Sequence, residues 1–525
     1  MSQFTETEMN NTDNSNSTHV RPFKEIFVTF DDQSADIDTA IFGKLELCVN
    51  KHERTIDKQY DLEFYMDNSS SMHDPCRDGT TKMEHTKRTA ERLILHLCER
   101  GIKATISVSS FDNKINRLVT KEELTVDNIQ GIVTKIRSIV PYDMTNIEAV
   151  LTEASQKVRS RDIEHIFFMF TDGEATCGKT KDRYELIDIS KKIIGATKVT
   201  IGCGTEHDSE LLNGISCGVN DIYKFVGKIE ESGMACGEIL DKILNVVLKR
   251  VLVSVKDGEI YDWRDNQWKD YIVTENIISE CDKFYHVRSK TPETFRAYIR
   301  GTEFDTGDQH NAHSNELIMR QDLSDYKFRQ ETLEILFEVN DYNGMHNKYS
   351  YNPNKTTESE LKRRLADLLT RMQQYMTERS LSRDVFMRML CDDIVVCLRT
   401  FGTDNSLMYT RSRQHTQGTQ GIYNNTIDYS EAQMQFPHVH SHYLNYDVAE
   451  LDDEEELDND LENEGAIDAC SGIGLSKNNS ASSCDSDATY VPNHMELTQN
   501  YKTMGSDDSP YATQRTLRLM KHISR

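Results

Sequence analysis

The sequence of 525 residues lacks the features that mark several large classes of protein. No stretch approaches the eighteen or so continuous apolar residues of a membrane-spanning helix. The polar start, MSQFTETEMNNTDNSNST, has neither the basic beginning nor the apolar centre of a signal peptide. Basic residues number 61 against 87 acidic ones, a balance that speaks against binding to a phosphate backbone. We therefore expect a soluble, intracellular protein of the cytoplasm, with the nucleus as the alternative, and neither nucleic acid nor membrane as a partner.

The twelve cysteines are scattered and include no CxxC pair. Several lie inside apolar segments, namely Cys98, Cys203, Cys391 and Cys397. A disulfide framework or a zinc site would need tighter spacing, so we interpret these residues as reduced core thiols.

A short histidine run, PHVHSHY, places His438, His440 and His442 at alternate positions. On a strand these side chains would face one way and would suit zinc or copper. The run borders a strongly acidic segment, DVAELDDEEELDNDLENE, which is typical of disordered chain. A solvated tail is therefore the favoured interpretation of the histidines.

What the sequence does contain is an alternation of apolar runs and amphipathic stretches. YDLEFYM and HIFFMFT are apolar nearly throughout, as strands covered on both faces are, and segments such as MEHTKRTAERLILHLCERG between them have helical spacing. This pattern predicts an α/β fold with a doubly wound, mainly parallel sheet. Short alternating runs from residue 250 predict an accessory β-sandwich, and apolar residues three and four apart after 326 predict helices.

We therefore expect six regions along the chain. They are a disordered N-terminus (1–23), a β preface (24–57), the doubly wound domain (58–249), a β-rich accessory domain (250–325), a helical region (326–425) and a mostly disordered acidic tail (426–525).

Polar side chains follow two of the apolar strands directly. In FYMDNSSSM, Asp67, Ser69 and Ser71 come after the first strand, and Asp172 follows HIFFMFT. Thr145 lies on the loop leading into another predicted helix. Ligands of such sheets bind at the carboxyl ends of the strands, so we expect these five residues to converge on one edge. Hydroxyl and carboxylate oxygens are the ligands that magnesium prefers.

The DxSxS pattern, a distant Thr and a TDG after a later strand together resemble the metal-ion-dependent adhesion site (MIDAS) of von Willebrand factor type A (vWA) domains. The resemblance implies a Mg²⁺ (or Mn²⁺) ion held directly by the Ser69 and Ser71 hydroxyls. Asp67 and Asp172 would bind it mostly through water, and Thr145 would enter or leave the shell with conformation. An Asp or Glu from a protein partner would complete the shell, so the resemblance implies an interaction module rather than an enzyme.

Two further segments resemble parts of intracellular vWA proteins from large DNA viruses and some eukaryotes. One is EESGMACGEILDKILNVVLKRVLVSVKDGEI, after the expected domain, and the other is RSRQHTQGTQGIYN at 411–424. The Arg and Gln residues of the second segment would contact either a partner or the sandwich. We favour a folded-back structural strap.

The sequence departs from the MIDAS pattern at two places. Ser70 replaces the usual glycine between the serines, and Asp143 and Met144 replace the glycines before Thr145. A Cβ at Ser70 would disfavour a turn with positive φ, and the Asp143 charge would attract a cation or repel an acidic ligand. Three alternatives stay open: the five residues only cap helices and turns, the domain is a metal-dependent hydrolase, or it is a scaffold with a vestigial site. The partner and the oligomeric state stay unknown.

Overall fold

The structure is a computed structural model that describes residues 21–32, 39–52, 58–76, 78–204, 207–226, 229–346, 358–402, 406–421 and 509–524. These residues fall into two compact units. The first holds the residues up to Gln330 together with Gly418–Gly421 and the C-terminal stretch from Tyr511, and the second holds the helical residues Glu331–Gln417.

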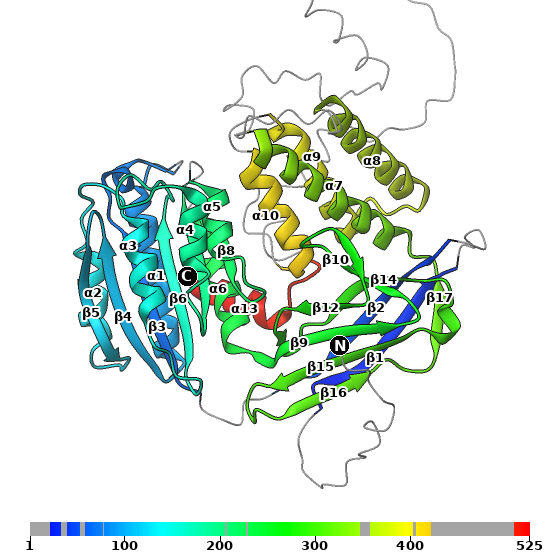
Figure 1. The fold of residues 1–525 in the computed structure, drawn as a ribbon, viewed down its shortest axis with the longest axis horizontal. Coiled ribbons are helices and arrows are strands. Elements are labelled where there is room, and N and C mark those ends of the chain that lie inside the picture. The colour runs from blue at the N-terminus through cyan, green and yellow to red at the C-terminus, as the bar shows by residue number, and fades with distance from the viewer. Residues whose placement is uncertain are drawn as a thin grey trace, which may run out of the picture. The chain divides into compact units, whose positions relative to one another are not determined.

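A six-stranded sheet with the order β5-β4-β3-β6-β7-β8 forms the centre of the α/β domain in the first unit (Figure 1). Its strands are β3 (Tyr60–Asp67), β4 (Ala104–Phe111), β5 (Ile115–Glu123), β6 (Glu164–Thr171), β7 (Ala196–Cys203) and β8 (Ile222–Val226). Neighbouring strands run parallel except β5, which is antiparallel to β4. The predicted doubly wound, mainly parallel sheet is therefore confirmed.

Helices cover both faces of this sheet. They are α1 (Lys82–Glu99), α2 (Ile129–Arg137) and α6 (Ile229–Leu244) on one face, and α3 (Ile147–Gln156), α4 (Arg183–Ser190) and α5 (Ser209–Ile215) on the other. Thr81 and Glu84 form a reciprocal capping box at the start of α1. Gly101 follows its end with φ of 63°, the left-handed conformation expected of a glycine there.

Two further sheets make the β-sandwich of the first unit. One sheet, in the order β11-β10-β14-β2-β1-β17, contains β11 (Gln267–Lys269), β10 (Glu259–Asp262), β14 (Lys283–Ser289), β2 (Ile41–Val49), β1 (Phe23–Asp31) and β17 (Ile318–Gln321). The other contains β12 (Tyr271–Thr274), β9 (Val246–Lys256), β15 (Arg296–Glu303) and β16 (Gln309–His313), with β13 (Ile277–Ile278) paired to β9 and the short helix η3 (Pro292–Thr294) before β15. The strands predicted as a separate preface, β1 and β2, are thus central strands of the sandwich, and their apolar residues share its core.

The second unit is helical, as predicted. It contains α7 (Ser324–His346), whose first turns belong to the first unit, with α8 (Glu358–Glu378), α9 (Val385–Thr400) and α10 (Ser406–Thr419). Asp393 is fully buried in this unit, where Gln417 Nε2 donates to Oδ2 at 2.7 Å and Arg413 Nη1 lies 3.3 Å from Oδ1. These contacts give the Arg and Gln residues of the 411–424 segment an internal structural role.

The end of the predicted strap contacts the sandwich. Lys283 Nζ donates to the Thr419 carbonyl at 2.7 Å, and the Gln420 side chain exchanges two hydrogen bonds with the Phe284 backbone at 3.2 and 2.7 Å. Residues 411–419 of the segment belong to helix α10, and residues 422–424 lie outside the described residues.

The last described residues form a helix that the sequence analysis did not predict. Helix α13 (Gln514–Ser524), red in Figure 1, packs on α6, where Gly237 lets the two backbones approach closely at Met520. Arg515 Nε donates to Asp241 Oδ1 at 2.8 Å, and Leu519 and Ile523 join the core of the α/β domain. Residues 1–20 of the expected disordered N-terminus (1–23) lie outside the described residues, and Phe23 already begins β1. The acidic run and the histidine run fall within 422–508, which also lie outside the described residues.

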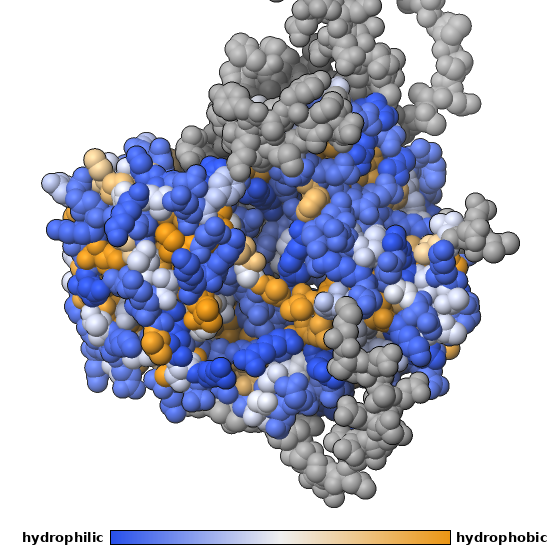
Figure 2. All heavy atoms as spheres, viewed as in Figure 1, coloured by the Kyte–Doolittle hydropathy of each residue, from blue (hydrophilic) through white to orange (hydrophobic). Residues whose placement is uncertain are grey.

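Polar groups dominate the surface seen in Figure 2, with apolar side chains in small patches among them. Scattered apolar side chains of this kind are normal on protein surfaces. No helix in the described ranges combines the length and apolar character needed to cross a membrane.

Candidate metal centre

Three loops meet at the carboxyl edge of the central sheet. The first follows β3 and begins the short helix η2 (Ser70–His73), the second precedes α3, and the third follows β6. Ser70 N donates to the Asp143 carbonyl at 3.0 Å, which joins the first loop to the second. Thr145 N donates to Thr176 Oγ1 at 2.7 Å, and the Thr145 carbonyl accepts from Thr176 N at 3.1 Å, which joins the second loop to the third.

Asp67 ends β3 and is completely buried. Ser69 N donates to Oδ1 at 2.8 Å and Thr171 Oγ1 donates to Oδ2 at 2.5 Å. Burial, followed by the negative charge of nearby Asp172, raises the pKa of Asp67 to about 7. The hydroxyls of Ser69 and Ser71 lie 3.1 Å apart in the same loop. The first loop therefore presents a carboxylate and two hydroxyls side by side.

Asp172, which directly follows β6, is the second buried carboxylate, with 3% of its surface exposed. Lys82, the first residue of α1, places its ammonium 3.1 Å from Asp172 Oδ2. Burial alone would lower the pKa of Lys82, but the Asp172 carboxylate raises it above its ordinary value. The other oxygen, Oδ1, is buried without a hydrogen-bond partner. Asp67 and Asp172 are thus both buried at this edge, and Asp172 is paired with an ammonium.

Thr145 lies just before α3 and is 1% exposed. Asp143, two residues earlier, has φ of 64°, the left-handed conformation that glycine adopts most easily and that Asp tolerates better than most residues. Ser70 is not among the described residues with positive φ and instead begins η2. Neither departure from the MIDAS pattern therefore forces the loop out of place.

The donor set fits a hard divalent cation. All five expected ligands offer oxygen, and such cations prefer oxygen. The unpartnered Oδ1 of Asp172 supports the fit, because a buried carboxylate oxygen without a partner is costly unless a cation or water satisfies it. The Asp67 and Asp172 carboxylates also destabilise one another's charges, which a cation would relieve.

Sequence reasoning missed two residues of this edge. Thr171 holds Asp67 from a strand 104 positions away, and its position next to Asp172 was the only available signal. Lys82 lies 90 residues from Asp172, and nothing in the sequence around it indicates an ion pair.

These features define a doubly wound α/β domain with an oxygen-rich edge. The family model described as von Willebrand factor type A domain matches residues 62–174, a range that includes all five expected ligands. The chain therefore contains a vWA domain, which supports a role as a protein-interaction or adhesion-type module.

Several solved structures are similar to this chain. A von Willebrand factor type A protein from Catenulispora acidiphila is 12% identical over 70% of this chain and 90% of its own, with a TM-score of 0.46. The proximal thread matrix protein 1 of the mussel byssus is 20% identical over 37% and 51%, with a TM-score of 0.31. The pilus adhesin SpaC from Lactobacillus rhamnosus GG is 11% identical over 55% and 47%, with a TM-score of 0.32. The comparison with curated proteins gives no match.

Proposed function

We propose that the vWA domain binds Mg²⁺ (or Mn²⁺) through Asp67, Ser69, Ser71, Thr145 and Asp172, and captures an acidic residue of a protein partner. The observation that carries the proposal is the pair of buried carboxylates, Asp67 and Asp172, at one sheet edge, where the Lys82 ammonium pairs with Asp172 Oδ2 and Asp172 Oδ1 has no partner among the described residues. This edge has an excess of negative charge that a dication would neutralise.

The ion, when bound, would supply a positive centre that accepts an external carboxylate oxygen. The protein's own residues fix where that happens. Thr171 and the Ser69 backbone hold the Asp67 carboxylate, and the links from Ser70 to Asp143 and from Thr145 to Thr176 keep the three loops together. The site therefore supplies binding rather than turnover, and we propose that the protein is not an enzyme.

Exposed apolar side chains beside the site support a protein as the partner. Val140, Tyr142 and Met144 are 65%, 72% and 52% exposed, and they lie on the loop that supplies Thr145. Tyr142 N donates to the Asn68 carbonyl at 2.5 Å, which fixes this apolar rim against the first loop. Aromatic and Met side chains are enriched in protein interfaces.

We further propose that the protein works in a reducing compartment, the cytoplasm or the nucleus. The ten cysteines of the described residues are free thiols. Disulfides are rare where glutathione and thioredoxin keep thiols reduced.

Isothermal titration of Mg²⁺ into the full chain tests the metal site. Wild type should bind one ion, and both Asp172→Ala and Ser69→Ala should abolish the signal. Ser70→Ala is the matched control, because Ser70 is exposed, lies in the same loop and is not an expected ligand. Absence of Mg²⁺ binding by the wild-type protein would contradict the proposal and would favour a scaffold with a vestigial site.

Capture of partners tests the second half of the proposal. The true partner should bind with Mg²⁺, be released by EDTA and fail to bind Asp172→Ala. Replacing one of the partner's own Asp or Glu residues by Asn or Gln should then abolish its binding to the wild-type chain. Turnover of phosphoesters that vanishes with Asp67→Asn would instead make the domain a metal-dependent hydrolase.

A further inference from the structure

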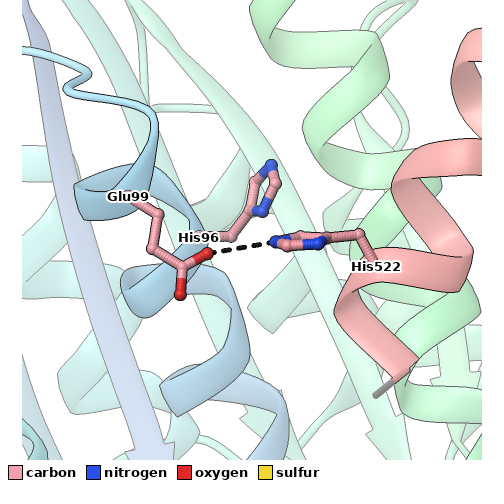
Figure 3. Close-up of side chains that lie close together, drawn as sticks. All are labelled: His96, Glu99 and His522. Atoms are coloured by element: carbon pink, nitrogen blue, oxygen red, sulfur yellow. Dashed lines mark hydrogen bonds and ion pairs between the residues drawn. The ribbon is translucent and has the colours of Figure 1, made fainter.

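A second cluster of metal-ligand side chains lies away from the MIDAS edge, where the last turn of α1 meets α13. His96 and Glu99 come from α1 and His522 from α13, and one potential ligand atom of each lies within 4.8 Å of the others. Figure 3 shows the three side chains converging from the two helices. His522 Nε2 lies 3.2 Å from Glu99 Oε2, across 423 residues of sequence.

His96 is the unusual member of this cluster. It is 5% exposed, and neither ring nitrogen has a hydrogen-bond partner. A buried polar ring without any partner costs free energy, and native structures rarely leave such groups unsatisfied. Burial lowers the pKa of His96 to about 4, so the ring is neutral and carries a free lone pair at neutral pH. The ring of His522 packs against it with 5.4 Å between the centroids.

The local geometry places all three residues well for one ion. His96 and Glu99 are three residues apart and therefore share a face of α1. Helix α13 is held against α6 by Leu519, Ile523 and the contacts of Arg515 with Asp241, so His522 faces α1 independently of any ligand. The Glu99 and His522 side chains are 60% and 62% exposed. These two exposed side chains are free to adjust to zinc bond lengths, which are about 2.0–2.2 Å for nitrogen and oxygen ligands.

We propose that His96, Glu99 and His522 form a second metal site, of the zinc class, that fastens the C-terminal helix to α1. Two imidazoles and one carboxylate form a ligand set that suits zinc and its transition-metal neighbours, whereas magnesium prefers oxygen alone. The site differs from the MIDAS edge in ligand chemistry, in position and in the elements that build it. Its ligands come from α1 of the vWA domain and from α13, the last described helix, so metal binding would couple α13 to the vWA domain.

Titration with Co²⁺, followed by its visible absorption, tests this site in the full chain. The histidine run would compete, so the background variant replaces His438, His440 and His442 with Ser. With excess Mg²⁺ present to fill the proposed MIDAS, we expect one equivalent of Co²⁺, which Zn²⁺ displaces. His522→Gln and Glu99→Gln should each weaken binding more than about tenfold, since loss of even an outer-shell partner has an effect of that size.

Matched controls separate this site from the rest of the protein. His313→Gln removes an exposed histidine of the sandwich and should leave the Co²⁺ signal unchanged. Asp172→Ala should also leave it unchanged, which distinguishes this site from the proposed MIDAS. Zn²⁺ should slow proteolytic removal of α13 in the background variant and have no such effect after His522→Gln. Absence of Co²⁺ and Zn²⁺ binding, or binding that both ligand variants retain, would reduce the cluster to a surface contact and overturn the proposal.

Discussion

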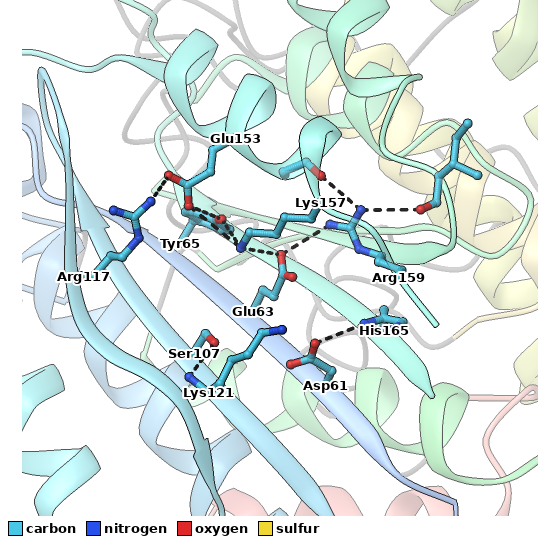
Figure 4. A network of polar contacts seen from close by, with 12 residues as sticks. Asp61, Glu63, Tyr65, Ser107, Arg117, Lys121, Glu153, Lys157, Arg159 and His165 are labelled. Carbon is cyan, nitrogen blue, oxygen red and sulfur yellow. Dashed lines mark hydrogen bonds and ion pairs between the residues drawn. The ribbon is translucent and has the colours of Figure 1, made fainter. Parts of the chain in front are cut away.

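The two ends of strand β3 both carry buried carboxylates, but the charged groups around those carboxylates differ. Asp61, Glu63 and Asp67 alternate along the strand, so they share the face that packs toward α3. All three are buried. Toward the amino end, shown in Figure 4, Glu63 meets cations of the protein itself. Glu63 Oε2 lies 3.2 Å from Lys157 Nζ and 3.4 Å from Arg159 Nη2. Asp61 Oδ2 lies 3.2 Å from the ring nitrogen Nδ1 of His165.

At the carboxyl end of β3, Asp67 has no such pair of cations beside it among the described residues. Within the described part of the chain, Asp67 accepts hydrogen bonds from two neutral donors, the Ser69 backbone N–H and the Thr171 hydroxyl, and the charge acting on it most strongly is that of another carboxylate, Asp172. The ammonium of Lys82 compensates part of this charge. A strand can therefore carry buried acidic residues along one face when the protein supplies the counter-charges. Where it supplies too few, the edge is suited to binding a cation from solution.

The largest expected effect comes from removing a counter-charge at the amino end. Arg159→Leu deletes a cation whose side chain is only 3% exposed and leaves buried Glu63 with Lys157 alone. We expect a loss of about 3–5 kcal/mol in the free energy of unfolding, the usual result of breaking a buried pair. Urea denaturation with and without Mg²⁺ measures it, and the loss should not depend on the metal.

A control within the same network is Arg117→Leu. Arg117 pairs with Glu153 at 2.6 Å but its side chain is 58% exposed, so the variant should lose no more than about 1 kcal/mol. Equal losses for the two variants would mean that burial does not distinguish these ion pairs.

In protein freed of metal by EDTA, the free energy of unfolding should depend on pH through Asp67 at the carboxyl end of β3. Burial and then Asp172 raise the pKa of Asp67 from 3.8 to about 7, so the folded protein holds this proton more tightly than the unfolded chain. The resulting stabilisation is complete below about pH 4 and is lost as the pH rises through about 7. Relative to Asp67→Asn, the wild type should therefore lose about 2–4 kcal/mol of unfolding free energy between pH 4 and 8.

Urea denaturation across this pH range provides the measurement. Saturating Mg²⁺ should reduce the loss, because the cation takes over the role of the proton. Parallel pH profiles for wild type and Asp67→Asn would show that Asp67 is already compensated, and the contrast between the two ends of β3 would disappear.

The sequence predicts the features of the fold and of the candidate site that depend on local patterns. The strands and helices of the vWA domain follow from local apolar patterns, and the placement of Asp67 and Asp172 at one edge follows from the rule that parallel strands end together. Contacts between residues that are far apart in the sequence could not be predicted. Lys82 joins Asp172 across 90 residues, and β1 pairs with β17 through contacts such as Val28 with Ile318. Helix α13 was missed because the short segment RTLRLMKHISR was assigned with the acidic tail before it.

Lys82→Met should change the free energy of Mg²⁺ binding at the carboxyl end of β3 by a smaller amount. The substitution keeps an unbranched side chain of similar length beside Gly204 but removes the ammonium from Asp172. A dication would then no longer compete with an internal cation, so Mg²⁺ should bind about tenfold more tightly, a gain of about 1.4 kcal/mol. Lys87→Met on the same helix is the matched control, since Lys87 Nζ donates to the Arg137 carbonyl, and it should leave the affinity unchanged. Weaker Mg²⁺ binding in Lys82→Met would show that the ammonium shapes the site instead of competing for it, and the carboxyl end of β3 would then resemble the amino end, with a counter-charge built in.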